Sequence, residues 1–501
     1  MKRRRMQYRK MQKIRKRGVM QYVRKSLLII GLLISGSAFG QNSIDSLLVL
    51  PDSIRPFTIE TFYHFVMMNH PVARQADLLS DVARQELRLA RGNFDPKLEA
   101  QYLTKSYNGT TYYNIFNSSL KIPTILPFDP AFGVEQNSGT FLDPEHYISN
   151  QFDYRQFYAG ISLPLGRGLI TDERRAALKQ AQLFGDMMEA EQVKIMNKLF
   201  LEAAKDYWNW AFTFYNYKLF DKNVGVALEI FRRVKLNHQM GEAAPIDTVQ
   251  AKITLQQRIV ERQEALLEFQ NTGILLSNYL WDSLSNPLEL SLNFAPILQR
   301  DLIGMTEPER DELVNLARAN HPELQKIEVK LRQLDVDRRL ATEFLKPRLD
   351  VNYYLINQPF DPDWNANLQF NDNYKFGLDF SFPVFLRKER AKLAQTKLKI
   401  SNTQFEQSFA ERQIVNQVLA AYNELTNSER IIAQQSDMVE NYDLLLQAEL
   451  LNLENGESDL FRINIQIEKL IQSQSKLIKL LGDYEKQKAF LYWAAGTRRL
   501  R

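Results

Sequence analysis

The sequence predicts a mainly helical fold with a few short strands, built from two copies of one unit. Two proline-free stretches of unusual length predict very long helices, and a short alternating segment before each of them predicts a strand. The same succession of landmarks then occurs twice along the 501 residues. Helices of this length do not fit a compact core, so we expect an extended helical body.

The longer stretch follows Pro383, the last of the 18 prolines. It keeps apolar residues at helical spacing, and a helix from about Arg387 to Asn455 would be roughly 100 Å long at 1.5 Å per residue. The segment before it alternates apolar and polar residues with the period of a strand. Its apolar face is predicted to consist of Phe376, Leu378, Phe380 and Phe382.

The first copy repeats this arrangement. Ala159, Ile161 and Leu163 alternate with small or polar residues, and Pro164 occupies the place that Pro383 has in the second copy. No proline then occurs before Pro245, which predicts a second long helix. The two segments therefore predict a strand that is followed directly by a very long helix, twice.

The N-terminus has the pattern of a secretory signal peptide. Residues 1–40 contain twelve Lys and Arg residues and no acidic residue, followed by an apolar run from Leu27 to Ile34 and small residues up to Gly40. Translation could start at Met1 or at Met20, where the basic region would have ordinary length. Removal of residues 1–40 leaves 52 basic and 59 acidic residues, so the overall charge of +5 gives no argument for a nucleic-acid partner.

The remaining composition limits the class of protein. The chain has no cysteine, so it can form no disulfide and carries no lipid on a cysteine. No apolar run after residue 40 reaches the roughly 18 residues that a membrane helix needs. If the mature chain crosses a membrane, it is expected to do so with strands.

The repeat can be measured from its landmarks. Asn320-His321-Pro322 follows Asn69-His70-Pro71 by 251 residues, and the same offset relates Pro347 to Pro96. We infer an internal duplication in which each copy consists of helices, two strands, a long helix, a turn and a returning helix. The expected organisation is a signal peptide at 1–40, a first repeat at 41–290, a connector at 291–308 and a second repeat at 309–501.

Each repeat is expected to supply two strands of roughly ten residues, a length that crosses a bilayer when tilted. The first pair is predicted near 97–104 and 154–165, and the second near 348–356 and 374–383. The residues between the first two strands, 105–153, contain several prolines and many Asn and Tyr residues. They are expected to form a long exterior loop, although an extra strand or a plug is an alternative.

These motifs resemble the TolC-like outer membrane efflux protein family over almost the whole mature chain. The resemblance rests on the repeated Asn-His-Pro, on Pro96-Lys97-Leu98 and Pro347-Arg348-Leu349, on the strand ends near Pro164 and Pro383, and on the turns at Gly241 and Gly456. It implies a trimer with a 12-stranded β-barrel in the outer membrane and an α-helical barrel in the periplasm. Four strands cannot close a barrel alone, and three chains are the fewest that leave a lumen.

The resemblance also implies a function. The chain would export small molecules or proteins, as the exit duct of a tripartite efflux pump or a type I secretion system, with a periplasmic adaptor and an inner-membrane pump as partners. The alternative is a secreted or cell-surface structural coiled-coil protein without a channel. That protein would have to bury the apolar strand face of Phe376, Leu378, Phe380 and Phe382, whereas the channel would turn it toward lipid.

The hairpin tips, near 240–246 and 455–459, are the candidate entrance. Asp247 matches an acidic entrance position of the family, but it could equally be an ordinary charge in the first turn of a helix. The corresponding position after Gly456 holds Arg462, which departs from the family pattern. Glu242, Asp247, Glu457, Asp459 and Arg462 are the candidate gate, and Gly241, Ala243, Gly456 and Ser458 are the candidate adaptor contacts.

Gly241 and Gly456 would also end the long helices, and this structural role is compatible with an adaptor contact. We predict that Arg462 pairs with a tip carboxylate, within or across chains, and holds the resting entrance shut. The sequence shows no catalytic set, no metal-ligand spacing among its five histidines and no phosphate loop, so neither an enzyme nor a cofactor is expected.

Overall fold

The computed structural model describes residues 48, 55–148, 153–241, 243–291, 293–298, 302, 304–357, 373–455 and 457–497. The chain divides into two units, Met1–Val49 and Leu50–Arg501, and all the elements below belong to the second. The predicted signal peptide and the candidate site residues Glu242 and Gly456 lie outside the described residues.

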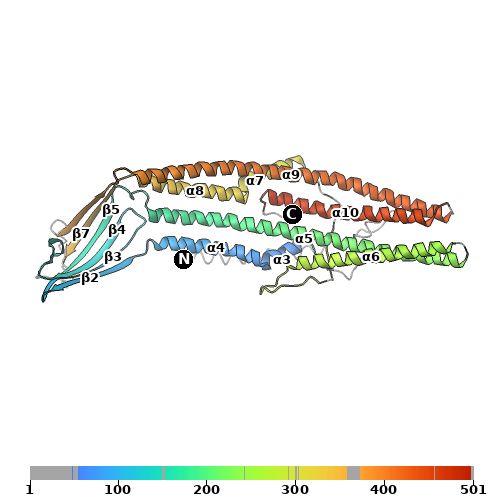
Figure 1. The fold of residues 1–501 in the computed structure, drawn as a ribbon. Helices are drawn as coiled ribbons and strands as arrows, with labels where there is room; N and C mark the ends of the chain where they lie inside the picture. Colours follow the sequence, from blue (N-terminus) through green and yellow to red (C-terminus); the bar gives the residue numbers. More distant parts are fainter. Residues whose placement is uncertain are drawn as a thin grey trace, which may run out of the picture. The chain divides into compact units, whose positions relative to one another are not determined.

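Two helical hairpins dominate the second unit (Figure 1). The first consists of α5 (Glu173–Gln239) and α6 (Pro245–Ser277), and the second of α9 (Arg387–Glu454) and α10 (Leu460–Ala494). Helices α5 and α9 have 67 and 68 residues, so each is about 100 Å long. The two predicted long helices are confirmed, and their lengths agree to within one residue.

Two shorter helices begin each copy: α3 (Ile59–Asn69) and α4 (Pro71–Gly92) in the first, α7 (Glu307–Asn320) and α8 (Pro322–Glu343) in the second. In each copy the first helix ends and the second begins at the repeated His-Pro. His70 Nδ1 accepts a hydrogen bond from the N–H of Val72 at 3.1 Å, and His321 Nδ1 accepts one from the N–H of Glu323 at 3.2 Å. Both histidines therefore cap a helix whose first residue is proline.

The helices of the two copies pack side by side. Helix α5 contacts α4, α8 and α10, and α9 contacts α7, α8 and α10. Helices α5 and α10 thus join the two hairpins (Figure 1). A two-stranded parallel pair, β1 (Arg55–Pro56) with β6 (Phe294–Ala295), ties the segment before α3 to the connector. Beside it, Phe62, Tyr207 and Trp210 are fully buried and form an aromatic core.

One antiparallel sheet contains six strands among the described residues. Its neighbours follow chain order, as Figure 1 shows. The strands are β2 (Lys97–Tyr107), β3 (Thr110–Lys121), β4 (Asp129–Ser138), β5 (Arg155–Pro164), β7 (Arg348–Asn357) and β8 (Tyr374–Ser381). The fold class, mainly helical with an antiparallel sheet, is confirmed.

The expectation of four strands per chain is wrong, because β3 and β4 lie where the sequence predicted a loop at 105–153. The turn between β2 and β3 is Asn108-Gly109, where both residues have positive φ, 49° and 75°. Asn-Gly is a strong hairpin signal. The prolines that follow led to the prediction of a loop instead. One of them, Pro130, lies within β4, and its carbonyl accepts a hydrogen bond from the N–H of Ile122 at 2.9 Å. A short 3-10 helix, η1 (Pro144–His146), follows β4.

The sheet register separates the side chains onto two faces. Phe376, Leu378 and Phe380 in β8 stand opposite Tyr353, Val351 and Leu349 in β7, so all six share one face. Along this face the register continues through Ile161 and Leu163 in β5, Phe132 and Val134 in β4, Phe116 and Leu120 in β3, and Leu98 and Tyr102 in β2. The predicted phase of the last strand is confirmed, although Phe382 lies one residue beyond β8.

Candidate functional site

The first hairpin tip is closed by its own backbone and side chains. Gly241 has φ +85°, a conformation that favours glycine, and ends α5. The Asp247 carboxylate accepts a hydrogen bond from the N–H of Ala244 at 3.1 Å. A ring nitrogen of His238 lies 2.9 Å from the carbonyl of Ala243. Asp247 therefore has the structural role of a capping residue in the first turn of α6.

The second tip is closed differently. Asp459 is the N-cap of α10, and its carboxylate accepts a hydrogen bond from the N–H of Arg462 at 2.9 Å. The hydroxyl of Ser458 donates to the carboxylate of Glu449 in α9. One acidic residue thus serves each tip, but from the N-cap here and from the third helical position at the first tip.

The predicted lock by Arg462 finds no partner among the described residues of one chain. Among the residues that the structure describes, Arg462 forms no ion pair, and only its backbone N–H is engaged by Asp459. A pair with Glu242, or with a carboxylate of a second copy, stays a prediction. Within the described part of a single chain, Arg462 is thus a charge on the first turn of α10.

Apolar side chains near both tips are exposed in the single chain. Met240 and Ile246 are 68% and 67% exposed at the first tip, and Leu451 and Phe461 are 62% and 63% exposed at the second. Exposed apolar groups gathered at the ends of two hairpins are typical of a contact surface. The tips therefore combine a surface suited to protein contacts with the two capping carboxylates.

An ion pair between a buried arginine and a partly exposed glutamate joins the two hairpins farther from the tips. Arg258 in α6 is 4% exposed and contacts Glu261 at 2.6 Å and Glu468 of α10 at 2.5 Å. Burial opposes the charged form, but the hydrogen bonds to Glu261 and Glu468 outweigh it and raise the pKa of Arg258. Arg258 is thus a fully charged cation between the two repeats.

Sequence reasoning missed Arg258, although a signal was present. Ala251, Arg258 and Ala265 are spaced seven residues apart and are all buried on α6. A charge at a heptad position between two alanines points to a buried polar contact between helices. Its acidic partner Glu468 could not be recognised, because α10 carries several other charges.

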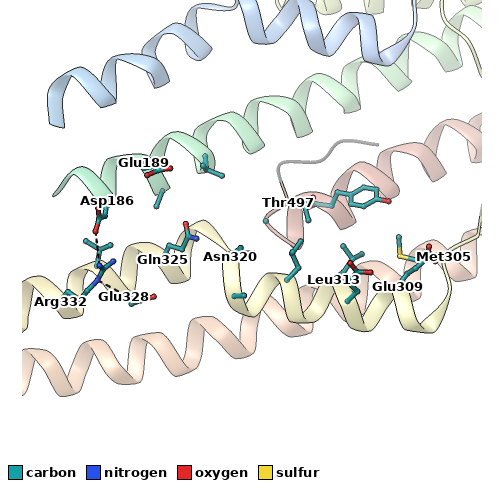
Figure 2. A pocket seen from close by; sticks show the side chains of 18 residues that line it. Asp186, Glu189, Met305, Glu309, Leu313, Asn320, Gln325, Glu328, Arg332 and Thr497 are labelled. Atoms are coloured by element: carbon teal, nitrogen blue, oxygen red, sulfur yellow. Dashed lines mark hydrogen bonds and ion pairs between the residues drawn. The ribbon is translucent and has the colours of Figure 1, made fainter. Parts of the chain in front are cut away.

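A cavity of about 900 Å³ lies among α5, α7, α8 and the end of α10 (Figure 2). Arg332 on its wall contacts Asp186 at 3.2 Å and Glu328 at 4.0 Å, as the dashed lines show. Glu189 and Glu309 add further carboxylates to the lining. No group of three or more potential ligands placed to hold a metal ion was found among the described residues.

The two faces of the sheet differ sharply in chemistry. The apolar face is exposed in the single chain: Phe376, Leu378 and Phe380 are 57%, 59% and 68% exposed. The opposite face of β8 carries Lys375 and Asp379. A soluble chain would cover such an apolar face, so the face needs lipid or another protein around it.

None of the described helices is both long enough and apolar enough to cross a membrane.

The comparisons with known proteins agree with this architecture. Residues 313–497 match the model of the outer membrane efflux protein family. None of the curated proteins compared with the chain matches its sequence. Solved structures match over most of the chain, at identities that establish a common fold only.

Three of these structures illustrate the likeness. The CmeC outer membrane channel of Campylobacter jejuni is 12% identical with a TM-score of 0.59, covering 93% of this chain and 94% of its own. The outer membrane protein VceC of Vibrio cholerae is 13% identical with a TM-score of 0.60, covering 87% and 96%. The open state of the MtrE outer membrane channel of Neisseria gonorrhoeae is 14% identical with a TM-score of 0.58, covering 87% and 88%.

These matches confirm the predicted resemblance to the TolC-like outer membrane efflux protein family. The matched family and these structures belong to the outer membrane, in agreement with the predicted location. The matched family consists of efflux ducts and is not an enzyme family.

Proposed function

We propose that the chain is one subunit of a homotrimeric export duct, which carries small molecules or proteins from a periplasmic entrance to the cell exterior. The duct has no energy source of its own and is driven by an inner-membrane pump through a periplasmic adaptor. It serves either a tripartite efflux system or a type I secretion system.

One observation carries this proposal. A sheet with one exposed apolar face is joined directly to helices about 100 Å long, because β5 leads into α5 and β8 leads into α9. The apolar face suits lipid, and the helices are long enough to extend far from it. An export duct requires such a connection between the strands in the membrane and a distant entrance at the hairpin tips.

The proposed trimer follows from the open sheet. Backbone groups at a sheet edge cannot remain unpaired in hydrocarbon, so the sheet must be closed by other copies of the chain. Closed rings of identical subunits are the usual solution. Three copies would bring six hairpin tips together at one entrance.

The entrance is proposed to be gated at these tips. Asp247 and Asp459 from three copies would form rings of carboxylates, which favour cations. Glu242, Glu457 and Arg462 complete the proposed gate, and Arg462 would pair with a carboxylate of a neighbouring copy. The adaptor is proposed to contact the tips at Gly241, Ala243, Gly456 and Ser458, beside the exposed Met240 and Phe461.

The alternative, a structural coiled-coil protein at the cell surface, does not account for the apolar sheet face. Such a protein would leave Phe376, Leu378 and Phe380 in water, which is unfavourable by about 25 cal/mol for each Å² of apolar surface. The duct is therefore the better explanation of this face.

Fractionation and conductance test the proposal together. The full chain should be recovered in detergent-extracted outer membrane and should form ion-conducting channels in planar bilayers. Recovery from the soluble periplasm, or membrane recovery without conductance, would contradict it. An antibiotic panel on a deletion strain, with protein secretion followed in parallel, would then separate small-molecule efflux from polypeptide export.

A further inference from the structure

The hairpin β3–β4 distinguishes the first copy from the second, yet part of its length continues the apolar face of the sheet, which becomes polar where Gln136 stands opposite Phe116. Leu120 stands opposite Phe132 on the apolar face, and Ser118 stands opposite Val134. The next residues along each strand, Ser119 and Gly133, share the polar face. A loop in water would not be expected to continue the apolar face of the neighbouring strands.

The polar face also joins this hairpin to the other strands. The Tyr158 ring of β5 lies across Gly133 of β4, where an added Cβ would come within 2.2 Å of the ring. Its hydroxyl donates to the side-chain oxygen of Asn117 in β3 at 3.2 Å. Tyr354 of β7 packs against Tyr158 with ring centroids 5.6 Å apart. Strands β3, β4, β5 and β7 are thus bound into one sheet.

The even number of strands keeps the two edge strands of the sheet antiparallel, as closure with other copies requires. The six strands alternate in direction, so β2 and β8 run antiparallel to each other. Each has a single neighbour among the described strands, β3 for β2 and β7 for β8. An inserted pair of strands leaves this relation unchanged, whereas a single inserted strand would make the two edges parallel.

We propose that β3 and β4 are lipid-facing strands of the membrane wall, and that β8 of one copy pairs with β2 of the next. This inference rests on the proposed function. Three copies of six strands would then close a wall of eighteen strands instead of the twelve that the family resemblance implies. Barrel diameter grows roughly linearly with strand number, and barrels of 16–18 strands leave an aqueous channel. The exit would be about half as wide again as a twelve-stranded one.

Single cysteines test the wall directly, because the chain contains none of its own. The variants Val134→Cys and Glu135→Cys place a fluorophore on the two faces of β4, and Leu378→Cys and Asp379→Cys do so on β8. The labelled full-length protein is reconstituted into phosphatidylcholine vesicles. Quenching by a lipid-attached nitroxide is then compared with quenching by iodide in water.

The expected result is lipid quenching at positions 134 and 378 and iodide quenching at 135 and 379. Iodide quenching at both 134 and 135, with alternation kept at 378 and 379, would overturn the inference and leave the duct intact. Lipid quenching at none of the four positions would contradict the proposed duct itself. The two failures are therefore distinguishable.

Cross-linking tests the edge pairing. Ala100→Cys in β2 is combined in turn with Phe376→Cys, Leu378→Cys and Phe380→Cys in β8, all on the apolar face. Facing residues of neighbouring strands lie within disulfide reach, so at least one combination should give covalent trimers after oxidation. Asp379→Cys on the opposite face is the matched control. No cross-link in any combination, or a cross-link only with position 379, would overturn the pairing.

Discussion

The two repeats agree in their helices and differ in their strands. Helices α5 and α9 differ by one residue in length, and the returning helices α6 and α10 have 33 and 35 residues. The first repeat nevertheless has four strands in the large sheet and the second has two. If both tips form one entrance, as proposed, helix length is constrained, whereas strands can be added in antiparallel pairs without changing how the sheet closes.

The largest effect is expected from a charge on the apolar face. Phe380→Asp in the second repeat should prevent assembly, because a charge that faces lipid costs up to about 2 kcal/mol in each of the assembled copies. Val134→Asp should act in the same way if the extra hairpin of the first repeat shares the wall. The measurement is the yield of heat-resistant trimer on gels. Asp379→Asn is the control, and a yield equal to that of Phe380→Asp would contradict the assigned faces.

Deletion of the extra hairpin should make the first repeat resemble the second. The hydrogen bond from Thr140 N–H to the Thr111 carbonyl, 3.1 Å, places the turn before β3 and the end of β4 at the same end of the sheet. Removal of residues 108–138 should therefore let β2 pair with β5, retain assembly and lower the single-channel conductance. Removal of β4 alone should abolish assembly, because it makes neighbouring strands parallel. Unchanged conductance after the paired deletion would argue against a wall with six strands from each copy.

The contact between the repeats should depend on Arg258. Arg258→Ala leaves Glu261 and Glu468 without their cation and should destabilise the hairpins by about 1–3 kcal/mol, because both carboxylates keep some contact with solvent. Faster hydrogen exchange in both α6 and α10 would report the loss. The double variant Arg258→Met with Glu468→Leu should recover part of it. Faster exchange confined to α6 would show that the ion pair does not couple the repeats.

The two histidine caps should respond differently to acid. Burial lowers the pKa of His321 to about 4, from an ordinary value of 6.5, and also lowers the pKa of His70. The unfolded chain therefore binds a proton first, so stability from neutral His321 is complete above pH 6.5 and falls toward pH 4. The full loss would be about 3 kcal/mol.

His321→Asn keeps a capping acceptor but cannot titrate in this range. The difference in trimer dissociation temperature between the original chain and this variant should change between pH 6.5 and 4. His70→Asn should produce a smaller change, because His70 is less buried in the structure. A constant difference across this range would show that His321 stays neutral in both states or titrates equally in both.

The smallest effects are expected at the tips. Asp459→Ala removes the N-cap of α10 and should cost about 1 kcal/mol, and Asp247→Ala should cost less, since Asp247 lies inside the helix. The Asn variants keep an acceptor without the charge. They should lower the cation selectivity of the channel while leaving stability unchanged, and unaltered selectivity would reduce both residues to capping roles.

Arg462→Ala tests the proposed gate at the same scale. If Arg462 pairs with a carboxylate of another copy, its removal should raise single-channel conductance or the leakage of large antibiotics into cells. Arg462→Lys keeps the charge and is the matched control. Unchanged conductance would leave Arg462 as the solvated helix charge that a single chain shows.

The sequence by itself determined the features with a clear local periodicity. Proline-free apolar spacing predicted α5 and α9, alternation predicted the apolar face of β8, and the repeated His-Pro marked the starts of α4 and α8. The duplication and the resemblance then predicted a membrane duct. These features are local because spacing along the chain is sufficient to identify a helix, a strand or a cap.

The tertiary structure alone decided which distant segments meet. Strands β3 and β4 mix aromatic, polar and proline residues, and only their register against β2 and β5 reveals an apolar face. Arg258 and Glu468 lie 210 residues apart, so their contact depends on how α6 packs beside α10. Asp247 and Asp459 proved to be caps because the backbone geometry of each tip brings an N–H to the carboxylate. Strand register, ion pairs and capping hydrogen bonds depend on which groups lie close together in space, and the spacing of residues along the chain does not specify this.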